Sequence, residues 1–318
     1  MSQVIVVGAG NWGKNLVSNF HALGALAAVA EASPVLRQAT AVTYPNVKLY
    51  SSFEEALSSS AQAIVIATPA PTHYRFARAA LEAGKDVFVE KPMTLKVAEA
   101  RDLTSLAEQK GQILMVGHLL LYQPAIAWMR DYLASGEAGE VWHIATRRAK
   151  LGKVRAEENV WWSFAPHDVS VVLELLGRPQ LKGVKALAHP MLQTDIADDV
   201  NVLLEFTSGQ TAHIHSSWYW PLNERSTTIL CEKKMLVYNE VSQTVTVYNK
   251  GIKADLSNRD EGSFVAPVTS DEPLKLECQH FLSCIDSREP AHSDGSNGIA
   301  VVEILEKAQK AMKEVAYV

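Results

Sequence analysis

Val4-Ile5-Val6-Val7-Gly8-Ala9-Gly10-Asn11-Trp12-Gly13 is the stretch of sequence that decides the fold. An apolar run of strand type leads directly into glycines with G-x-G-x-x-G spacing. At such a strand-to-helix turn, the first glycine makes the tight bend, the second lets a pyrophosphate approach the backbone, and the third lets the helix pack close to the strand. The helix N-terminus then offers N–H groups to phosphates. The stretch predicts a Rossmann dinucleotide-binding domain; the alternative is a merely tight turn.

The second strand ends at Glu31, about 20 residues further on, where a Rossmann domain places an acid for the adenosine ribose. A carboxylate accepts hydrogen bonds from the ribose hydroxyls and repels a 2′-phosphate. Glu31 therefore favours NAD over NADP, although Arg37 could bind a phosphate and Glu31 could instead be a solvent-facing turn residue.

Residues 1–118 alternate short apolar runs with segments of helical periodicity, which is typical of β-α-β units and a parallel sheet. The expected strands are Val4–Val7, Ala27–Ala30, Lys48–Leu49, Ala63–Ala67, Asp86–Val89 and Ile113–Val116. The expected helices are Trp12–Leu23, Phe53–Leu57, Thr72–Glu82 and Lys96–Gln109.

After residue 140 the pattern changes to successive strands joined by short turns, which predicts a largely antiparallel sheet. The expected strands are Val141–Leu151, Lys182–His189, Val200–Phe206, Gln210–Trp218, Ser226–Cys231, Met235–Tyr238 and Thr244–Tyr248. Helices are expected at His167–Leu176 and around Leu274–Ile285 and Gly298–Val315, and a mobile loop at 250–273. The fold class is therefore α/β. A Rossmann NAD-binding domain spans 1–120, and an α+β domain with a large open, mostly antiparallel sheet spans 121–318, for substrate binding and oligomerisation.

Composition excludes several other classes of protein. A chain of 318 residues, 47% of them hydrophobic, is long enough for two domains with separate cores. A net charge of -5, with no stretch of lysines and arginines that forms a nucleic-acid footprint, argues against nucleic-acid binding. The apolar run Ile113–Leu121 is far shorter than the roughly 20 residues of a membrane span, and we expect no signal peptide. Cys231, Cys278 and Cys284 lack metal-ligand spacing, so we expect reduced thiols, no metal and a cytoplasmic location.

Glu90-Lys91-Pro92 stands where the fifth strand ends, at the edge of a parallel sheet where such folds bind ligands. The proline keeps Lys91 out of the helical region and fixes the bend, so the lysine can point toward a bound ligand. Taken alone, Lys91 could equally be a surface lysine at a strand end.

The motifs follow one another in a characteristic order. The glycine turn and Glu31 come first, followed by Ala67-Thr68-Pro69 with Thr72-His73, then Glu90-Lys91-Pro92, and finally Gly117-His118. This series resembles the Gfo/Idh/MocA family, named after glucose–fructose oxidoreductase and inositol dehydrogenase. The resemblance covers essentially the whole chain, including the antiparallel second domain. It implies an NAD-dependent sugar dehydrogenase.

The resemblance also implies roles for individual residues. Lys91 would lie beside the substrate hydroxyl and the nicotinamide, and His167 would be the second catalytic residue. Cofactor contacts are implied for Gly8, Gly10, Asn11, Trp12, Gly13, Glu31, Thr68, Pro69, His73, Glu90 and His118. Many members have an aspartate four residues before the histidine, but this chain has Ser163 there, so no carboxylate partner is expected at that position. The alternative for His167 is a residue near a helix start without a chemical role.

Three segments narrow the substrate, namely residues 117–125, 147–155 and 158–164. They resemble the branch of the family that oxidises UDP-N-acetylglucosamine at C3 and feeds a 3-amino sugar into lipid A. The middle segment is rich in arginine and lysine, which bind diphosphates, and the neighbouring tryptophans offer rings to a uracil or sugar. Substrate contacts are expected from Lys91, Tyr122, Lys153, Arg155, Asn159, Trp161, His167 and Arg225. The alternative for the basic run is a solvated strand edge.

The implied reaction transfers a hydride from C3 of the sugar to C4 of the nicotinamide. His167 or Lys91 accepts the hydroxyl proton, and the other donates a hydrogen bond to the developing alkoxide. His167 is the favoured base, because an imidazole titrates near neutral pH. No metal is required, and the 3-keto product is expected to pass to an aminotransferase.

Two alternative functions stay open. Another enzyme of the family could act on UDP-N-acetylglucosaminuronic acid, with Arg147, Arg155 or Arg225 binding the extra carboxylate, or on a free polyol such as inositol. A non-catalytic NAD(H)-binding sensor is a different class of protein, and the presence of both Lys91 and His167 argues against it.

A homo-oligomer, either a dimer or a tetramer, is expected from the second domain. Val202, Leu204, Trp218 and Trp220 are expected to form an apolar face for sheet-to-sheet association.

Overall fold

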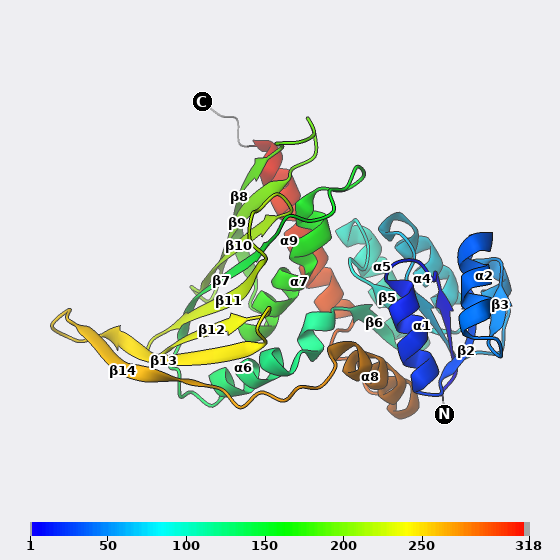
Figure 1. The fold of residues 1–318 in the computed structure, drawn as a ribbon, viewed down its shortest axis with the longest axis horizontal. Coiled ribbons are helices and arrows are strands. Elements are labelled where there is room, and N and C mark those ends of the chain that lie inside the picture. Colours follow the sequence, from blue (N-terminus) through cyan, green and yellow to red (C-terminus); the bar gives the residue numbers. More distant parts are fainter. Residues whose placement is uncertain (1, 315–318) are drawn as a thin grey trace. The chain divides into compact units, whose positions relative to one another are not determined.

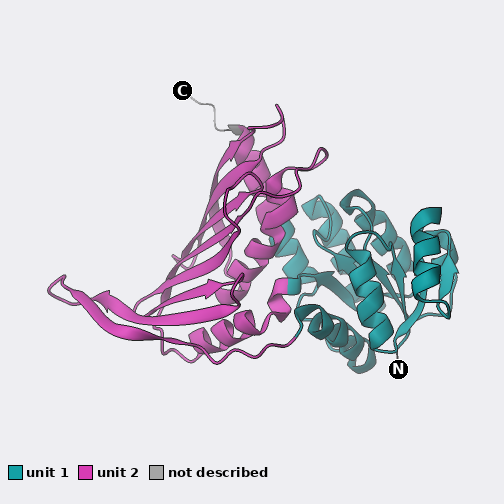
Figure 2. Cartoon of the chain, viewed as in Figure 1, with its two compact units in different colours: residues 1–119, 272–303 teal, residues 120–271, 304–318 magenta. Residues whose placement is uncertain are grey.

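The computed structural model describes residues 2–314, which form two compact units (Figure 2). The first unit comprises the residues up to Leu119 together with Glu272–Glu303. The second comprises Leu120–Asp271 together with the residues from Ile304 onward. The expectation that all residues after 120 belong to the second domain is therefore wrong for Glu272–Glu303.

The reason for this difference lies in tertiary packing. Phe281, in the returning segment, contacts the rings of Phe20 and Phe88 in the first unit. Helical periodicity shows that a segment has an apolar face, but it does not show which sheet that face covers.

The first unit contains a parallel sheet of six strands in the order β3-β2-β1-β4-β5-β6. The strands are β1 (Val4–Val7), β2 (Leu26–Ala30), β3 (Lys48–Tyr50), β4 (Ala63–Ile66), β5 (Asp86–Glu90) and β6 (Leu114–Gly117). The strand order reverses between β1 and β4. In folds of this kind, the crevice outside the carboxyl ends of these two strands is where a dinucleotide binds.

Helices cover both faces of this sheet (Figure 1). They are α1 (Gly13–Ala22), α2 (Pro34–Thr43), α3 (Phe53–Leu57), α4 (His73–Glu82), α5 (Val97–Lys110) and α8 (Pro273–Ser287), with a short 3₁₀ segment at η1 (Ala70–Thr72). A second 3₁₀ segment, η2 (Leu119–Tyr122), begins at the last residue before the second unit. Helix α2 was not predicted from the sequence. Its start follows ordinary rules, because the Ser33 side chain accepts a hydrogen bond from the Leu36 N–H and Pro34 occupies the first turn.

The second unit contains an eight-stranded sheet in the order β14-β13-β12-β11-β7-β10-β9-β8. The strands are β7 (Val141–Ala149), β8 (Leu181–His189), β9 (Asp199–Phe206), β10 (Thr211–Ser217), β11 (Glu224–Cys231), β12 (Met235–Asn239), β13 (Thr244–Ile252) and β14 (Asn258–Val265). All neighbouring pairs are antiparallel except β7 and β10, which are parallel. The predicted fold class is confirmed.

Helices α6 (Pro124–Ala134) and α7 (Val160–Leu175) and the last part of α9 (Gly295–Glu314) lie over one face of this sheet (Figure 1). Helix α6 was not predicted. The region 250–273, expected to be a mobile loop, contains the end of β13 and the whole of β14, so that expectation is wrong. These strands pair as a hairpin in which the side chains of β14 are mostly exposed, and an exposed strand lacks the alternation that identifies half-buried ones.

Helix α7 begins at Val160 rather than at His167. The Asn159 side chain caps it by accepting a hydrogen bond from the Trp162 N–H at 3.1 Å. Pro166 lies inside the helix, where it removes one backbone hydrogen bond. Burial of most of the helix against the sheet outweighs that loss, so the proline does not mark the helix start.

Three of the four apolar residues expected to form an oligomer interface are in the wrong place for that role. Val202, Leu204 and Trp218 are buried within the second unit, and Trp220 is half-buried. Leu203, between two of them on β9, is 52% exposed on the opposite face. Side chains on β9 alternate between the two faces of the sheet, and the prediction chose the residues that point inward instead of those that point outward.

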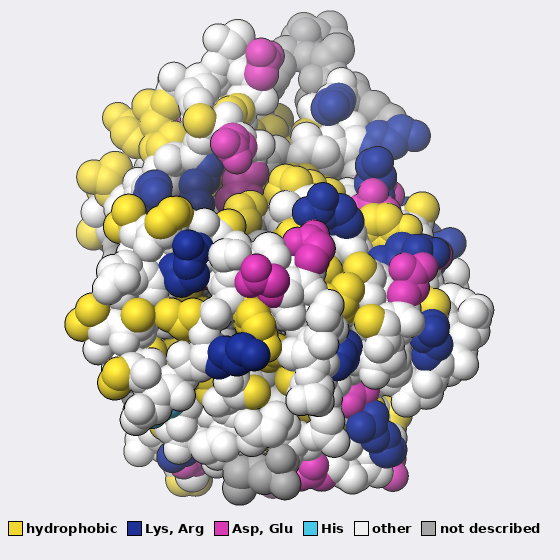
Figure 3. All heavy atoms as spheres, turned by 90° about the vertical axis from the view of Figure 1, so that its right-hand side faces the viewer, with side chains coloured by type: hydrophobic (Ala, Val, Ile, Leu, Met, Phe, Trp, Pro, Cys, Tyr) yellow, Lys and Arg dark blue, Asp and Glu magenta, His cyan; other side chains and the backbone are white. Residues whose placement is uncertain are grey.

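Residues 2–314 were also searched for disulfides, membrane-spanning helices and metal-binding groups. The three cysteines are buried free thiols. No helix in this range is long and apolar enough to cross a membrane, and no group of three or more His, Cys, Asp or Glu side chains is arranged to hold a metal ion. On the face shown in Figure 3, lysines and arginines are interspersed with acidic and apolar side chains.

Candidate active site

The glycine turn between β1 and α1 has the geometry of a phosphate-binding loop. Gly8 has φ +93°, and a Cβ there would lie 2.8 Å from the carbonyl oxygen of Ala67. A Cβ on Gly13 would lie 2.0 Å from the carbonyl oxygen of Gly8, so helix and strand approach too closely for any side chain. Beside Gly10, by contrast, no heavy atom lies within 4 Å of the Cβ position. The turn is thus tight where it must bend and open where a pyrophosphate would approach.

Glu31 connects the end of β2 to this turn. Its carboxylate accepts hydrogen bonds from the Ala9 N–H at 2.7 Å and from the Ser33 N–H at 2.8 Å. The side chain is therefore fixed beside the glycine turn. Arg37 donates to the carbonyl oxygens of Glu31 and Ala32, at 2.7 and 3.3 Å.

Asn11 and Trp12 occupy the variable positions of the turn, and both are exposed. The Trp12 indole N–H donates a hydrogen bond to the carboxylate of Glu90, which is buried at the end of β5. Glu90 also accepts a hydrogen bond from the Lys91 N–H at 3.2 Å. These bonds join the phosphate-binding turn to the turn that carries Lys91.

The loop after β4 is built around a buried histidine. His73 is 1% exposed, and its ring nitrogens lie 2.8 Å from the carbonyl oxygens of Thr68 and Pro92. Burial lowers the pKa of His73, whereas the two carbonyl contacts act in the opposite direction. His73 therefore connects the loop at Thr68 to the turn at Pro92, and its buried ring does not line the cofactor site as predicted. Thr68 and Pro69 are less buried, and the Thr68 hydroxyl lies 2.7 Å from that of Thr72.

Lys91 and His118 follow the neighbouring strands β5 and β6, whose ends pair Glu90 with Gly117. Lys91 is half-buried, and a cis peptide bond joins it to Pro92. His118 is buried, and its backbone N–H donates to the carbonyl oxygen of Val116 at 2.7 Å. Both residues thus stand at the carboxyl edge of the sheet, together with the rest of the predicted cofactor set.

In the second unit, His167 lies in the middle of α7. It is half-buried, as is Phe164 one turn earlier, whereas Ser163 is buried. The Ser170 hydroxyl donates to the carbonyl oxygen of His167 at 2.8 Å. Lys150 extends from the end of β7 to 6.0 Å from the centroid of the Phe164 ring. Burial, followed by the charges of Arg225 and Arg148, lowers the pKa of Lys150.

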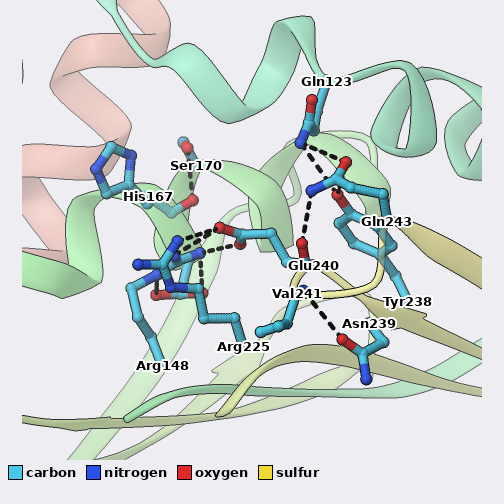
Figure 4. Close-up of polar contacts among 11 residues, drawn as sticks. Gln123, Arg148, His167, Ser170, Arg225, Tyr238, Asn239, Glu240, Val241 and Gln243 are labelled. Atoms are coloured by element: carbon cyan, nitrogen blue, oxygen red, sulfur yellow. Dashed lines mark hydrogen bonds and ion pairs between the residues drawn. The ribbon is translucent and has the colours of Figure 1, made fainter. Parts of the chain in front are cut away.

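A buried ion cluster anchors this part of α7 to the sheet (Figure 4). Arg148 of β7 donates to Asp168 at 2.8 and 3.2 Å, and to Glu240 at 3.1 and 2.8 Å. Arg225 donates to Glu240 at 3.2 Å. Because Asp168 directly follows His167, the cluster fixes the segment of the helix that carries the histidine.

The basic run from Arg147 to Arg155 does not form one patch. Arg147 lies on the outer face of the sheet, where it pairs with Glu224 at 3.0 Å, whereas Arg148 faces α7. Lys153 and Arg155 lie exposed in the loop after β7. The run was predicted as a single binding segment, but strand alternation divides it.

Two of the predicted substrate contacts are structural instead. Trp161 is fully buried, and its indole N–H donates to the carbonyl oxygen of Leu305 at 3.1 Å. Asn159 caps α7 and donates to Gln309 at 2.7 Å. Both predictions are therefore corrected. Tyr122 remains half-buried at the end of η2.

Family models match most of the chain. Residues 2–118 match the model described as the oxidoreductase family with an NAD-binding Rossmann fold, and residues 126–237 match the GFO/IDH/MocA C-terminal domain. The chain belongs to the Gfo/Idh/MocA oxidoreductase family. The resemblance inferred from the motifs is confirmed.

Relatives of known activity are sugar and polyol dehydrogenases. The chain is 26% identical to UDP-N-acetylglucosamine 3-dehydrogenase from Acidithiobacillus ferrooxidans over 93% of both chains. It is 27% identical to the NAD⁺-dependent scyllo-inositol 2-dehydrogenase of Bacillus subtilis, over 70% of this chain and 67% of the relative. It is 24% identical to inositol 2-dehydrogenase of Rhizobium meliloti, over 97% and 96%.

Solved structures share the fold. That of the A. ferrooxidans 3-dehydrogenase has a TM-score of 0.87 at 24% identity, covering 98% of this chain and 97% of that one. That of levoglucosan dehydrogenase with NADH and levoglucosan has a TM-score of 0.86 at 18% identity, covering 100% and 98%.

Proposed function

We propose that this protein is an NAD-dependent dehydrogenase that oxidises the C3 hydroxyl of UDP-N-acetylglucosamine to a 3-keto nucleotide sugar. The observation that carries the proposal is the similarity to the A. ferrooxidans 3-dehydrogenase over 93% of both chains. Lys91 and His167, the two residues on which the proposed chemistry depends, are both present.

The first unit would bind NAD in preference to NADP. The open backbone at Gly10 would accept the pyrophosphate, and the fixed carboxylate of Glu31 would accept hydrogen bonds from the ribose and repel a 2′-phosphate. Arg37, the candidate partner of such a phosphate, already donates to two main-chain carbonyls. When bound, NAD supplies the hydride acceptor.

Lys91 and His167 would divide the proton chemistry. His167 would take the proton of the C3 hydroxyl as general base, because an imidazole titrates near neutral pH. Lys91 would donate a hydrogen bond to the oxygen as negative charge develops there. The Arg148–Asp168 ion pair would hold the histidine's part of α7 in place during the reaction.

The diphosphate would bind to cations of the second unit. Lys150 and Arg225 lie on the face of the sheet that α7 covers, and Lys153 and Arg155 lie on the loop that follows β7. The partial desolvation of Lys150 favours a role in binding, because an anion would relieve the cost of its buried charge. The aromatic ring of Phe164, next to Lys150, offers an apolar surface to a sugar or uracil.

A second candidate is oxidation of a free polyol. Two relatives act on inositols, and one of them matches this chain over 97% of its length. A polyol lacks the diphosphate, so in that case the cations of the second unit would be unnecessary for turnover.

The ketone product suits an aminotransferase, which would yield a 3-amino sugar for lipid A. Buried free thiols suit a reducing cytoplasm. The outer face of the second sheet, opposite α7, would carry the contacts of a homodimer or homotetramer.

The test is a substrate panel. The purified protein is incubated with NAD and UDP-N-acetylglucosamine, UDP-N-acetylglucosaminuronic acid, N-acetylglucosamine or inositol, and NADH formation is followed by absorbance. We expect the first compound to be oxidised best. Preferential oxidation of inositol would establish the second candidate instead, and a protein that binds NAD(H) but oxidises none of them would be a sensor.

A further inference from the structure

Three buried aromatic rings join α1, β5 and α8 in the first unit. The ring centroid of Phe281 in α8 lies 6.5 Å from that of Phe20 in α1 and 5.6 Å from that of Phe88 in β5, both in edge-to-face geometry. Val87 and Val89, the neighbours of Phe88 on the strand, belong to the core on the opposite face of the sheet. The contacts of Phe281 therefore show which face of β5 meets α8.

The same packing brings two carboxyl groups together. Glu90 follows Phe88 by two residues, so the two side chains leave β5 on the same face. Glu277 precedes Phe281 by four residues, so these two share one face of α8. One helical turn and two strand residues cover similar lengths, about 6 Å. Helix α8 runs antiparallel to β5, because Arg288, just after the end of the helix, donates to Asp86 at the start of the strand at 2.8 Å. Glu277 consequently lies near Glu90, close enough for the charge of one to act on the other.

The two carboxyl groups differ in their hydrogen bonds. Glu90 accepts from the Trp12 indole and from the Lys91 N–H. Glu277 is fully buried, and neither of its carboxyl oxygens has a hydrogen-bond partner among residues 2–314. Gly117 closes the site, since a Cβ there would lie 3.0 Å from the Glu90 carboxyl carbon. A buried carboxylate without donors is costly, so this environment favours the neutral acid.

The titration of the two groups follows from this environment. Burial raises the pKa of Glu90 to about 7, although the hydrogen bond from the Trp12 indole and the charge of Lys91 both lower it. Burial, followed by the charge of Glu90, holds the pKa of Glu277 well above its ordinary value. Burial, followed by the charges of Glu277 and Glu90, raises the pKa of the Cys278 thiol on α8, so it stays neutral. Burial, together with the charge of Lys91, lowers the pKa of His73.

We propose that Glu90 and Glu277 form a buried acid pair that retains one proton through the neutral pH range and thereby limits the negative charge beside Lys91. In such a pair the second proton is retained because the first ionisation leaves a charge next to it. The consequence for catalysis rests on the proposed function, in which Lys91 acts on the substrate. Glu277 is then a positioning residue, because it acts on Lys91 only through Glu90.

Infrared titration of the protein without ligands tests the pair. At pH 8 exposed carboxyl groups are ionised, and the parent protein should retain the carbonyl band of one protonated carboxylic acid. Glu277→Gln should remove most of this band, because the remaining Glu90 loses its proton near pH 7. Glu90→Gln should move the loss of the Glu277 proton to lower pH, because the neighbouring charge is gone. Glu272→Gln, which changes an exposed acid at the start of α8, should leave the band unchanged.

Two infrared results would contradict the proposal that Glu90 and Glu277 retain a proton as a pair. One is a band at pH 8 that persists undiminished in Glu277→Gln, and the other is a titration of Glu277 that Glu90→Gln does not move. The infrared measurements require no NAD and no sugar. Their outcome is therefore independent of whether the protein oxidises the proposed substrate. The two variants test the pair independently, so one of them suffices if the other does not fold.

The consequence for Lys91 has a separate readout. With whichever sugar the enzyme oxidises, the pH profile of kcat/KM should contain an inflection near 7 from Glu90, in addition to that of the proposed base His167, in the parent protein and in Glu272→Gln. Glu90→Gln should lose the contribution of Glu90 and keep that of the base, so its profile should become less steep near pH 7, which a purely structural role of the pair would not predict. An unchanged profile in Glu90→Gln would overturn the link between the pair and Lys91.

Discussion

Arg148 and Asp168 form a buried, bidentate ion pair, with the guanidinium nitrogens 2.8 and 3.2 Å from the two carboxylate oxygens. It connects the centre of the second sheet to the residue that follows His167. The pair thus fixes a proposed catalytic side chain through the backbone of its helix rather than through a contact with the imidazole.

Replacing Arg148 with methionine should destabilise the protein strongly. The change leaves the carboxylates of Asp168 and Glu240 buried without their principal partner, and breaking such a pair typically costs about 3–5 kcal/mol. Arg147→Met removes an ion pair on the exposed face and should cost less than about 1 kcal/mol. Denaturant unfolding of the two variants measures the difference, and equal losses would contradict the role of the cluster.

The glycines of the turn should respond differently to the same substitution. Gly13→Ala places a Cβ 2.0 Å from the Gly8 carbonyl oxygen and should destabilise the first unit, by about 1–3 kcal/mol for an overpacked site. Gly10→Ala meets no atom within 4 Å and should leave the folded protein intact. Its NAD affinity should nevertheless fall, because the methyl group occupies the approach of the pyrophosphate. Thermal unfolding and NAD titration separate the two effects; unaltered NAD binding by Gly10→Ala would refute the assigned approach.

The charge of Glu31 should determine the choice between NAD and NADP. The parent protein should use NAD much better than NADP. Glu31→Gln keeps an acceptor for the Ala9 N–H but removes the negative charge. It should therefore reduce the difference in kcat/KM between NAD and NADP. Comparing kcat/KM for both cofactors provides the measurement. Equal use of both by the parent protein would show that Glu31 does not select the cofactor.

Lys91→Met and His167→Asn should each lower turnover by about 100- to 10,000-fold, the usual contribution of general acid–base catalysis. NAD affinity should stay close to that of the parent in His167→Asn, because His167 belongs to the second unit and the glycine turn to the first. Steady-state kinetics and NAD titration give both quantities. A variant with near-parent turnover would exclude its residue from the mechanism.

Neutralising Lys153 and Arg155 together should weaken the use of UDP-sugars and the inhibition by UDP, with little change in NAD affinity. Remote binding of a diphosphate positions the reacting sugar, so turnover should fall as well as affinity. Changing the exposed Lys182 and Lys185 of β8 to methionine removes the same charge elsewhere in the second unit and serves as the control. If both double variants bind UDP as the parent does, the loop is not part of the nucleotide site.

The sequence predicted the first unit well because its signals are local. Buried strands appear as unbroken apolar runs such as Val4–Val7, and the glycine spacing follows from close backbone contacts that admit no side chain. The return of α8 to this unit could not be predicted, since it depends on which sheet Phe281 meets.

The substrate side was harder to predict because neighbouring residues can have opposite roles. Trp161 and Trp162 are adjacent in the sequence, but about 100° of helical rotation separates them, and only Trp161 is completely buried. Lys150 was overlooked within the basic run, although it directly follows β7 and its two-residue spacing from Arg148 predicts that both side chains point to the same side of the sheet. Glu277 was overlooked as well, because an acid in an amphipathic helix usually faces solvent.

The most direct test of the proposed reaction follows the hydride itself. UDP-N-acetylglucosamine carrying deuterium at C3, or in a control at C4, is incubated with NAD and the protein, and the reduced cofactor is analysed by mass spectrometry. We predict that the C3 label appears in the reduced cofactor, that the C4 label does not, and that His167→Asn produces little reduced cofactor from either. Transfer of the C4 label, or no reduction of NAD by this sugar under conditions in which inositol is oxidised, would contradict the assignment of a 3-dehydrogenase.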